Sequence, residues 1–408
     1  MIDASARAGD DAGMGTRRVV GCMTGTSIDA LDAALVSIEG AGPGLHAQFI
    51  RGLTRPLGDL GARLRQLAAQ EPMPAGQIAG LARAFALLHI EVVRELLGSE
   101  SADLIAVHGQ TVLHAPPLSW QLFSPAPLAH ALQTPVVCDL RAADLAAGGQ
   151  GAPITPLADF VLFRNEAETR AVVNLGGFCN YTLLPAAHAP GVASDLTAWV
   201  GVVRGGDICA CNQLLDALAR ALFAAQFDED GRHARAGRVQ SGPRHELLTL
   251  LRAQSRAGRA LGTGDELSAW VAQHHAACSG DDLARTACEA VATVIVEGIT
   301  AVAQRSGVGA VRRYLLAGGG ARNPVLREVL AARVAAAPAA TPRAAPGPPG
   351  ADAAVVVTDA FGVPANYREA AAMAVLGALC QDGVPITLPQ VTGVPSPAPV
   401  AGVWVHPR

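Results

Sequence analysis

The sequence has few of the features expected of a protein that binds nucleic acid or an acidic membrane surface, or that is stapled by disulfides. Lysine and arginine together number 31 against 35 aspartates and glutamates, for a net charge of −4. That balance gives no electrostatic reason to expect either kind of polyanionic partner. The eight cysteines include no CxxC pair and no metal-finger spacing, so we interpret them as small buried hydrophobes in a reducing compartment.

Long apolar runs are also missing. No uninterrupted stretch reaches the roughly 20 residues that a membrane-spanning helix needs. The best candidate, 287–303, contains Glu289 and Glu297 and therefore predicts a buried helix of a soluble domain. Residues 1–17 carry three aspartates and no apolar block, which favours a loose tail over a signal peptide. We expect a cytoplasmic protein without a membrane or nucleic-acid partner.

The chain is long enough for two domains, because half of its 408 residues are hydrophobic and can bury a large core. Early in the chain, strand-like runs lie at 19–21, 33–38 and about 47–53, and helical periodicity follows at 57–69 and 75–97. This alternation predicts an α/β protein whose first three strands are antiparallel neighbours.

The segment 19–36 predicts a hairpin whose tip is made of glycines and hydroxyl side chains. Gly25 lets the backbone come close to an anion, while Thr26 and Ser27 add hydroxyl donors. Asp29 or Asp32 could hold a metal ion. Such a tip suits nucleotide phosphates, although an ordinary glycine-rich turn has the same composition.

Polar or glycine-rich residues follow most of the later predicted strands. After 103–107 come His108 and Gln110, which we interpret as polar groups facing a crevice. The strand predicted at 134–138 is followed by Asp139 and Arg141. The strand predicted at 313–317 is followed by a triple-glycine turn and a helix at 325–336. The glycine-rich pair Gly176-Gly177, within 171–182, echoes the opening hairpin.

Taken together, these stretches resemble the anhydro-N-acetylmuramic acid kinase family, in the family's order and over nearly the whole chain. The matching segments are 21–32, 107–111, 148–153, 174–180 and 318–324. The resemblance implies the two-domain α/β fold shared by actin, sugar kinases and the Hsp70 ATPase (ribonuclease H-like), with the nucleotide in the cleft between the domains. We expect domains at about 18–170 and 171–408, after the 1–17 tail.

The resemblance also implies an ATP- and Mg²⁺-dependent kinase that opens 1,6-anhydro-N-acetylmuramic acid with water and phosphorylates it, in peptidoglycan recycling. Asp207 then corresponds to the catalytic base, and Asp29 is the candidate for the metal. The expected nucleotide-binding residues are Gly25, Thr26, Ser27, Ile28, Asp29, Ala30, Leu31, Asp32, Asn174, Gly176, Gly177, Gly318, Gly319, Gly320 and Asn323. The expected sugar-binding residues are His108, Gln110, Asp139, Arg141, Gln150 and Glu369. A homodimer is possible.

The loop after Asp207 departs from the family pattern. A threonine and two glycines of that pattern are replaced by Ile208, Cys209 and Cys211, which predicts obstructed backbone approach to a phosphate or water. Two alternatives follow: a kinase of the same fold acting on another sugar, or a sensor that binds ATP or muropeptide without catalysis.

Overall fold

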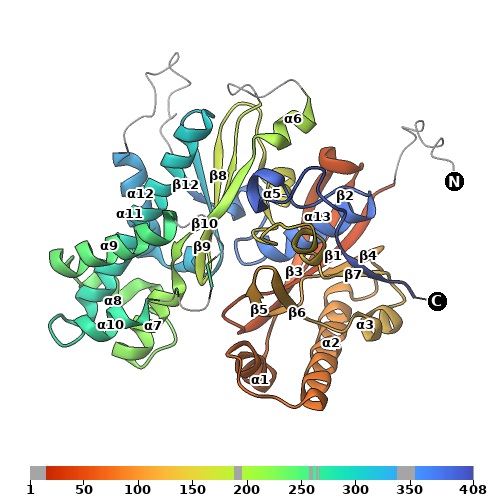
Figure 1. Cartoon of the computed structure of the whole chain (residues 1–408), viewed down its shortest axis with the longest axis horizontal. Coiled ribbons are helices and arrows are strands. Elements are labelled where there is room, and N and C mark those ends of the chain that lie inside the picture. The colour runs from red at the N-terminus through yellow and green to blue at the C-terminus, as the bar shows by residue number, and fades with distance from the viewer. Residues whose placement is uncertain are drawn as a thin grey trace.

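The computed structural model describes residues 15–187, 195–256, 261–262, 265, 267–337 and 354–407. Two lobes lie side by side, each built around one β-sheet with helices packed on it (Figure 1). The predicted N-terminal tail lies almost wholly outside the described residues, as does most of the predicted insertion at 335–353.

The first sheet is ordered β13-β7-β4-β1-β2-β3. Its opening strands β1 (Arg17–Thr24), β2 (Ala30–Glu39) and β3 (His46–Pro56) form an antiparallel meander, as the sequence predicted. β4 (Leu104–Val107) lies parallel to β1, and β7 (Val136–Cys138) lies parallel to β4. β13 (Val403–Val405) closes the edge antiparallel to β7.

The second sheet repeats this pattern in the order β10-β9-β8-β11-β12. Its strands are β8 (Arg170–Leu175), β9 (Phe178–Leu184), β10 (Arg204–Ala210), β11 (Arg313–Ala317) and β12 (Ala354–Val357). The first three are again antiparallel, and β11 and β12 join in parallel. The chain therefore contains the same five-stranded unit twice, which establishes the two-domain actin-like fold.

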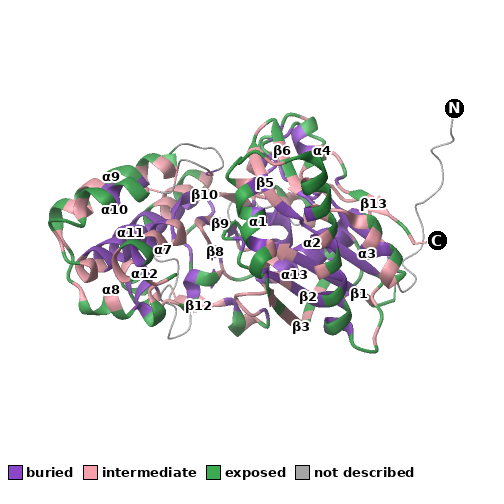
Figure 2. Cartoon of the chain, turned by 90° about the horizontal axis from the view of Figure 1, so that it is seen from below, coloured by how far each residue is buried: buried purple, intermediate pink, exposed green. Residues whose placement is uncertain are grey.

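Helices cover the sheets in the intervals between strands. Those of the first lobe are α1 (Gly58–Ala68), α2 (Ala75–Leu97), α3 (Pro125–Leu132) and α4 (Ala142–Ala146). Those of the second are α6 (Leu196–Gly201), α7 (Asn212–Phe223), α8 (Arg232–Ala236), α9 (Ser241–Arg256), α10 (Ser268–His274), α11 (Gly280–Ser306) and α12 (Pro324–Ala336). Short 3₁₀ turns lie at η1 (Gly42–Gly44), η2 (Glu229–Gly231), η3 (Gly319–Arg322) and η4 (Thr358–Phe361). Figure 2 shows the buried strands under largely exposed outer helix faces.

Two helices join the lobes. α5 (Pro156–Phe163) and α13 (Arg368–Gln381) pack together in one hydrophobic cluster that also takes Val19 from the first sheet and Val172 from the second. α13 crosses β1 very closely: a Cβ on Gly21 would lie 1.9 Å from the carbonyl oxygen of Ala370. Glycine at that point of β1 is therefore what lets the helix reach the sheet.

A buried ion pair lies at this junction. The Arg368 guanidinium on α13 binds the Asp159 carboxylate on α5, which also accepts a hydrogen bond of 2.5 Å from the Thr182 hydroxyl on β9. Arg368 donates a further bond, 3.0 Å long, to the Thr155 hydroxyl. Because a buried charge is tolerated only when paired, this cluster fixes α13, α5 and the second sheet relative to one another.

The C-terminal segment differs from expectation in two respects. The tail after Leu388 is rich in proline and valine, which favours an extended chain. It nevertheless contains the short helix α14 (Pro389–Thr392) before β13. Both α13 and β13 pack on the first sheet, although the sequence groups 171–408 with the second domain. A crossover helix and an edge strand complete a sheet from a distant part of the chain, which local periodicity does not reveal.

Two helices, α2 and α11, are long and apolar enough to cross a membrane by length and composition alone. Both pack against other elements of the fold, α2 on β2 and β3 and α11 among α7, α9 and α12. The core helix of a soluble protein passes the same test of length and composition. The prediction that 287–303 forms a buried helix is confirmed within the longer α11.

Candidate active site

The β1–β2 turn lies where the two lobes meet, since its Thr26 hydroxyl nearly touches Gly177 of the second lobe. Its tip exposes Thr26, Ser27 and Asp29, while the Ile28 N–H closes the turn with a bond of 3.1 Å to the Gly25 carbonyl. From α1, the Arg65 guanidinium donates to the Ile28 carbonyl at 2.7 Å. The hairpin prediction is confirmed, and the Thr26 and Ser27 side chains are exposed on a braced turn.

The β8–β9 turn faces the first turn across the cleft. A Cβ on Gly177 would lie 2.8 Å from the Thr26 hydroxyl, so the two turns nearly touch. The carbonyls of Gly176 and Gly177 accept hydrogen bonds from the first N–H groups of α7 and its preceding residue, at 2.9 to 3.0 Å. The N–H groups at the start of α7 are therefore already bonded to this turn.

The glycine turn after β11 packs directly on the end of β8. Gly318 has φ = 80°, and a Cβ there would lie 2.7 Å from the Asn174 side-chain oxygen. The Asn323 side-chain oxygen caps α12 by accepting hydrogen bonds from two backbone N–H groups at 3.0 and 3.1 Å. A glycine turn before a helix favours free N–H groups at the helix start. Here the Val325 and Leu326 N–H groups are bonded to Asn323, so any nucleoside contact must come from the turn itself.

Several buried polar atoms that lack a hydrogen-bond partner among the described residues lie at or just beyond strand ends lining the cleft. They are the Thr24 hydroxyl, the Gln110 amide oxygen, His114 Nε2 and the Asn174 amide oxygen. Leaving a buried polar group unpaired costs about 1–3 kcal/mol. Such atoms call for an explanation in a folded protein, and their position at strand ends in an α/β fold is where ligands bind.

Arg141 lies at the centre of the predicted sugar site. Its Nε and Nη2 atoms lie 3.1 and 2.9 Å from His108 Nε2, and Nη1 donates to the Gly151 carbonyl at 2.6 Å. Since a guanidinium can only donate, His108 Nε2 must accept, and His108 Nδ1 carries the proton toward the Gly109 carbonyl at 2.8 Å. Burial, with the charge of Arg141 added, lowers the pKa of His108 to about 3.

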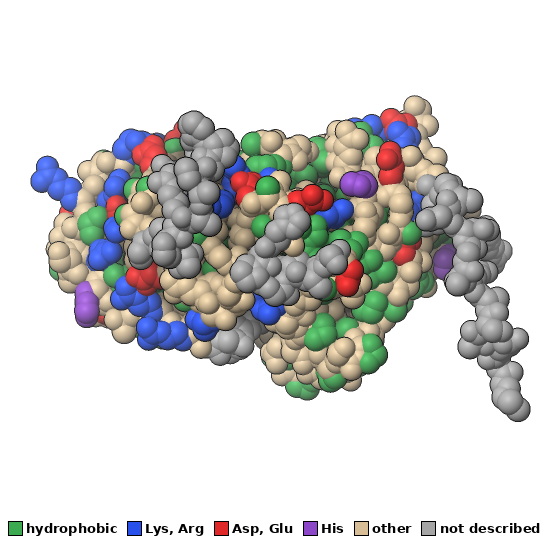
Figure 3. All heavy atoms as spheres, turned by 90° about the horizontal axis from the view of Figure 1, so that it is seen from above, with side chains coloured by type: hydrophobic (Ala, Val, Ile, Leu, Met, Phe, Trp, Pro, Cys, Tyr) green, Lys and Arg blue, Asp and Glu red, His purple; other side chains and the backbone are tan. Residues whose placement is uncertain are grey.

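Two carboxylates approach this arginine from elements far apart in sequence. Burial lowers the pKa of Arg141 to about 10, and the charges of Asp207 and Glu369 oppose that lowering. Burial also raises the pKa of Glu369, partly offset by Arg368. Acidic and basic side chains gather where the two lobes meet on the face shown in Figure 3. Arg141 therefore contacts His108 directly and is acted on by the charges of Asp207 and Glu369. The roles expected of these four residues stay predictions.

Asp207 lies on β10 at an irregularity of the strand. The register with β9 shifts between Asp207 and Cys209, and the Leu261 N–H donates to the Asp207 carboxylate at 2.7 Å. The sequence analysis expected a loop over 205–212, whereas β10 continues to Ala210. The bulge lets Asp207 project differently from the residues that follow it.

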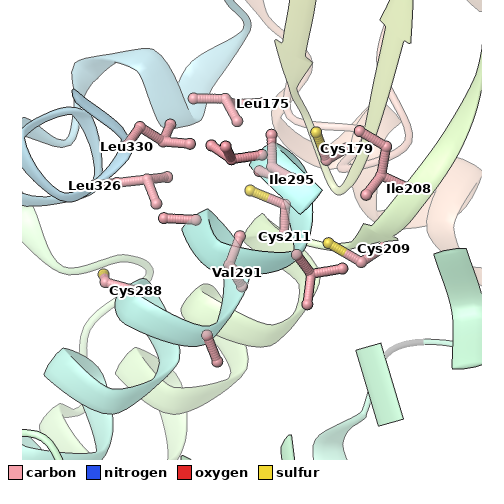
Figure 4. Packing of buried hydrophobic residues seen from close by; sticks show 14 of the residues in the cluster. Leu175, Cys179, Ile208, Cys209, Cys211, Cys288, Val291, Ile295, Leu326 and Leu330 are labelled. Carbon is pink, nitrogen blue, oxygen red and sulfur yellow. The ribbon is translucent and has the colours of Figure 1, made fainter. Parts of the chain in front are cut away.

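The residues that depart from the family pattern pack into the core of the second lobe. Ile208, Cys209 and Cys211 are at most 1% exposed and belong to the cluster formed with α11. Figure 4 shows the sulfur atom of Cys211 between Ile295 and Val291, with Cys209 to one side below Ile208. The expected side-chain obstruction therefore lies on the core side of β10.

Charges of one lobe act on carboxylates of the other. Burial raises the pKa of Asp216 on α7 to about 6, and the charge of Asp29 in the first turn adds to it. Burial also raises the pKa of Asp32, opposed in part by the Arg322 charge from η3. Among the described residues no group of three or more possible metal ligands occurs, so a metal ion here would need oxygen ligands from elsewhere.

Asp139 and Gln150 are placed less closely to Arg141. Asp139 follows β7 with φ = 53°, and Gln150 is exposed on a loop whose backbone is tied to the Thr392 carbonyl at 2.8 Å. That loop is anchored by Asp144, which accepts from the Gly151 N–H and the Thr392 hydroxyl at 2.6 and 2.7 Å. No contact in the described part of the chain ties the side chain of Asp139 or Gln150 to Arg141.

Sequence reasoning missed three residues of this cleft. Arg322 lies two residues after the three glycines, Asp216 lies one helical turn into α7, and His114 lies three residues beyond the 107–111 segment. Arg322 and His114 each lie next to a recognised motif, which was the available signal. Asp216 was noted only as a match to the family, because a carboxylate on an amphipathic helix also suits a solvated face.

Comparison with known proteins finds relatives over nearly the whole chain. The family model described as anhydro-N-acetylmuramic acid kinase matches residues 17–405. A protein named anhydro-N-acetylmuramic acid kinase from Streptomyces coelicolor is 36% identical over 92% of this chain and 90% of its own. One of the same name from Salinibacter ruber is 34% identical over 95% and 96%. Component A of the Acidaminococcus fermentans (R)-2-hydroxyglutaryl-CoA dehydratase aligns at a TM-score of 0.42 with 14% identity, covering 89% of this chain and 98% of that one.

Proposed function

Because the chain belongs to the anhydro-N-acetylmuramic acid kinase family, we propose that the interlobe cleft is its active site and that Asp207 is the catalytic base. The enzyme is an ATP-dependent kinase of peptidoglycan recycling. The observation that carries the assignment is the contact of the Arg141 guanidinium with His108 Nε2 at 2.9 Å, because the charges of Asp207 and Glu369 also act on this arginine. The Thr26 and Gly177 turns lie against each other where the lobes meet. A single cleft thus offers a carboxylate, a sugar-binding corner and a phosphate-binding wall.

The reaction forms two bonds and breaks two in one site, and it moves one proton of water. The oxygen of a water molecule bonds to the anomeric carbon of 1,6-anhydro-N-acetylmuramic acid as the bond from that carbon to the bridging oxygen breaks. The freed oxygen on carbon six bonds to the γ-phosphorus of ATP, and the bond to the β-phosphate oxygen breaks to release ADP. The water proton passes to Asp207, and the product is N-acetylmuramic acid 6-phosphate.

Asp207 suits the role of base because its carboxylate is held in place. The Leu261 N–H fixes one carboxylate oxygen, and the positive charge of Arg141 acts on the group. Positioning of a base within reach of the attacking water is what gives proton transfer its effect. Arg141 and its neutral partner His108 would orient the sugar, together with Gln110 and Glu369.

ATP would lie with its phosphates against the first turn, where Gly25, Thr26 and Ser27 present N–H and hydroxyl groups, and its nucleoside toward Gly318–Gly320. A divalent cation such as Mg²⁺ neutralises charge on the transferring phosphoryl group. Asp29, with Asp216 opposite, would hold it, because Mg²⁺ takes one or two carboxylates and fills its remaining positions with water and phosphate oxygens. The raised pKa of Asp216 fits two carboxylates that share a cation.

The decisive experiment compares Asp207→Asn with the wild-type enzyme in an assay of ADP release from ATP and 1,6-anhydro-N-acetylmuramic acid. We expect kcat to fall by about 10²- to 10⁴-fold, while the dissociation constant for ATP changes less than about threefold. Asp230→Asn, on an exposed turn of the second lobe, is the matched control and should keep full activity. Near wild-type turnover in Asp207→Asn would show that the base lies elsewhere.

A further inference from the structure

The glycines of the 148–153 segment enclose a buried carboxylate. Asp144, on α4, is 0% exposed, and its Oδ2 atom accepts a hydrogen bond of 2.6 Å from the Gly151 N–H. The Gly149 N–H donates to the Asp144 carbonyl at 2.8 Å. A Cβ on Gly149 would lie 2.2 Å from Asp144 Oδ2, so any side chain at position 149 would displace the carboxylate. Glycine at this position therefore lets the loop close around Asp144.

The second oxygen of the same carboxylate is bound by a residue near the C-terminus. The Thr392 hydroxyl donates to Asp144 Oδ1 at 2.7 Å, and the Leu388 carbonyl is a more distant second acceptor at 3.4 Å. The Thr392 carbonyl accepts from the Gln150 N–H at 2.8 Å. Thr392 itself is 1% exposed. One buried residue of α14 therefore holds the loop both through its side chain and through its backbone.

The same loop holds Arg141. Gly151, whose N–H is bonded to Asp144, accepts with its carbonyl from Arg141 Nη1 at 2.6 Å. The Nε and Nη2 atoms of Arg141 lie 3.1 and 2.9 Å from His108 Nε2. A planar guanidinium bonded in this way at all three nitrogens has little freedom to turn. The position of the Gly151 carbonyl therefore sets the orientation of Arg141, and a continuous series of hydrogen bonds connects that carbonyl to Thr392.

The helix α14 is also tied to the second lobe. The Gln390 side-chain amide donates to the Val200 carbonyl in α6 at 3.0 Å. α14 packs on β10 as well, where a Cβ on Gly205 would lie 3.4 Å from Val391 Cγ1. β10 is the strand that carries Asp207. α14 therefore connects the loop described above with the strand of the proposed base.

We propose that Asp144 and Thr392 are positioning residues of the sugar site, which hold Arg141 in the orientation that binds the anhydro sugar. The inference rests on the function proposed above, in which Arg141 contacts the sugar. Without the Thr392 hydroxyl, Asp144 Oδ1 loses a partner in a buried place, and the carboxylate can turn away from the Gly151 N–H. The Gly151 carbonyl then shifts, and the guanidinium shifts with it.

The test compares two substitutions of Thr392 in the assay of ADP release. Thr392→Val replaces the hydroxyl by a methyl group of similar shape, whereas Thr392→Ser keeps the hydroxyl. With 1,6-anhydro-N-acetylmuramic acid, we expect Thr392→Val to raise KM for the sugar about 5- to 30-fold. KM for ATP should not change, and kcat should change less than about threefold, because a binding contact is lost. Thr392→Ser should keep the sugar KM within about threefold of the wild-type value.

The matched control is Thr293→Val. It removes a buried hydroxyl that donates to the Glu289 carbonyl within α11 at 2.6 Å, and it should leave the sugar KM unchanged. Asp144→Asn keeps the size of the side chain but leaves one oxygen where two donors are bonded, so it should also raise the sugar KM. This variant provides the test if Thr392→Val does not fold.

A second background separates positioning of Arg141 from a general loss of structure. Arg141→Lys keeps the positive charge, but lysine cannot reproduce the forked contact with Gly151 and His108. If Thr392 acts through Arg141, adding Thr392→Val to Arg141→Lys should raise the sugar KM less than about twofold further.

An unchanged sugar KM in a folded Thr392→Val enzyme would overturn the inference and leave the proposed function intact. So would a Thr392→Ser enzyme as impaired as Thr392→Val, or an undiminished effect of Thr392→Val in the Arg141→Lys background, because the residue would then act through the fold alone. A wild-type enzyme that releases no ADP with any anhydro sugar would overturn the proposed function and this inference together.

Discussion

The first turns of the two sheets occupy equivalent places in a repeated unit, yet they are fixed in different ways. The β1–β2 turn is braced from outside by Arg65 and leaves its hydroxyl side chains exposed. The β8–β9 turn is reduced to Gly176 and Gly177, whose carbonyls accept from the start of α7. The same topology therefore yields one turn that is open toward a ligand and one that is closed by its own helix.

This difference shows how a duplicated fold divides the work of a phosphate site. The open turn can offer N–H groups and hydroxyls to an anion, since its backbone bonds use the far side of the turn. The closed turn has no side chain at Gly177, so the Thr26 hydroxyl can approach it. The β1–β2 turn of the first lobe thus supplies hydrogen-bond donors. The β8–β9 turn of the second lobe supplies the space that lets the two turns come close.

Acid should weaken the first lobe most strongly. Burial lowers the pKa of His89 to about 4 and of His108 to about 3, below the ordinary 6.5. A lowered pKa means that the unfolded chain binds protons first, so stability is complete above pH 6.5 and is lost as pH falls toward 4. We expect a loss of about 2–3 kcal/mol for each histidine by pH 4.5 in urea unfolding.

Amide hydrogen exchange measured at pH 7 and pH 5 would locate that loss of stability. The exchange rates should rise most in α2, which carries His89. His89→Gln keeps a donor for the Phe85 carbonyl without a titrating ring, so its stability should vary less steeply with pH. An equal pH dependence in the variant would contradict the assignment to His89.

Gly318→Ala should damage the second lobe's turn more than Gly25→Ala damages the first. Alanine at 318 combines an unfavourable φ of 80° with contacts of 2.7 and 2.9 Å, so we expect a loss of about 2–4 kcal/mol in unfolding free energy. At Gly25 the nearest atom to an added Cβ is the Ser27 hydroxyl oxygen, 3.9 Å away. The loss of unfolding free energy there should stay below about 0.5 kcal/mol. Similar losses at both sites would remove the contrast between the turns.

Cys211→Gly, which restores the residue type of the family pattern, should destabilise the protein without improving catalysis. The thiol is fully buried beside α11, so its removal leaves a cavity and adds backbone freedom, at a cost of about 2 kcal/mol. The half-buried Cys278 is the control site for the same change. A gain in kcat would mean that Cys211 obstructs the cleft after all.

Arg65→Ala should have the smallest effect and act through the open turn. Loss of the bond to the Ile28 carbonyl costs about 1 kcal/mol at most at this exposed position, and it frees the turn to move. We expect KM for ATP to rise about threefold to tenfold with little change in the melting temperature. Arg63→Ala, two residues earlier on the exposed face of α1, should change neither KM for ATP nor the melting temperature.

Much of the fold could be predicted because it depends on local pattern. The meander of the first sheet, the long helices α2 and α11, and strand β11 lie where periodicity placed them, since apolar spacing follows the side-chain repeat of each element. The site was harder. His108 and Arg141 were chosen from their position after strands, while Arg322 and His114 escaped because nothing in the sequence indicates what a residue faces across a cleft.

By itself the sequence determined where glycine turns interrupt strands, which segments are strands or helices, and the family to which those motifs belong. These are properties of neighbours along the chain. Only the tertiary structure decided that Gly177 meets Thr26, that α13 returns to cross β1 at Gly21, and that a bulge after Asp207 directs Cys209 and Cys211 into the core. Those outcomes depend on packing between residues distant in sequence, where one ångström of clearance determines which groups can come together.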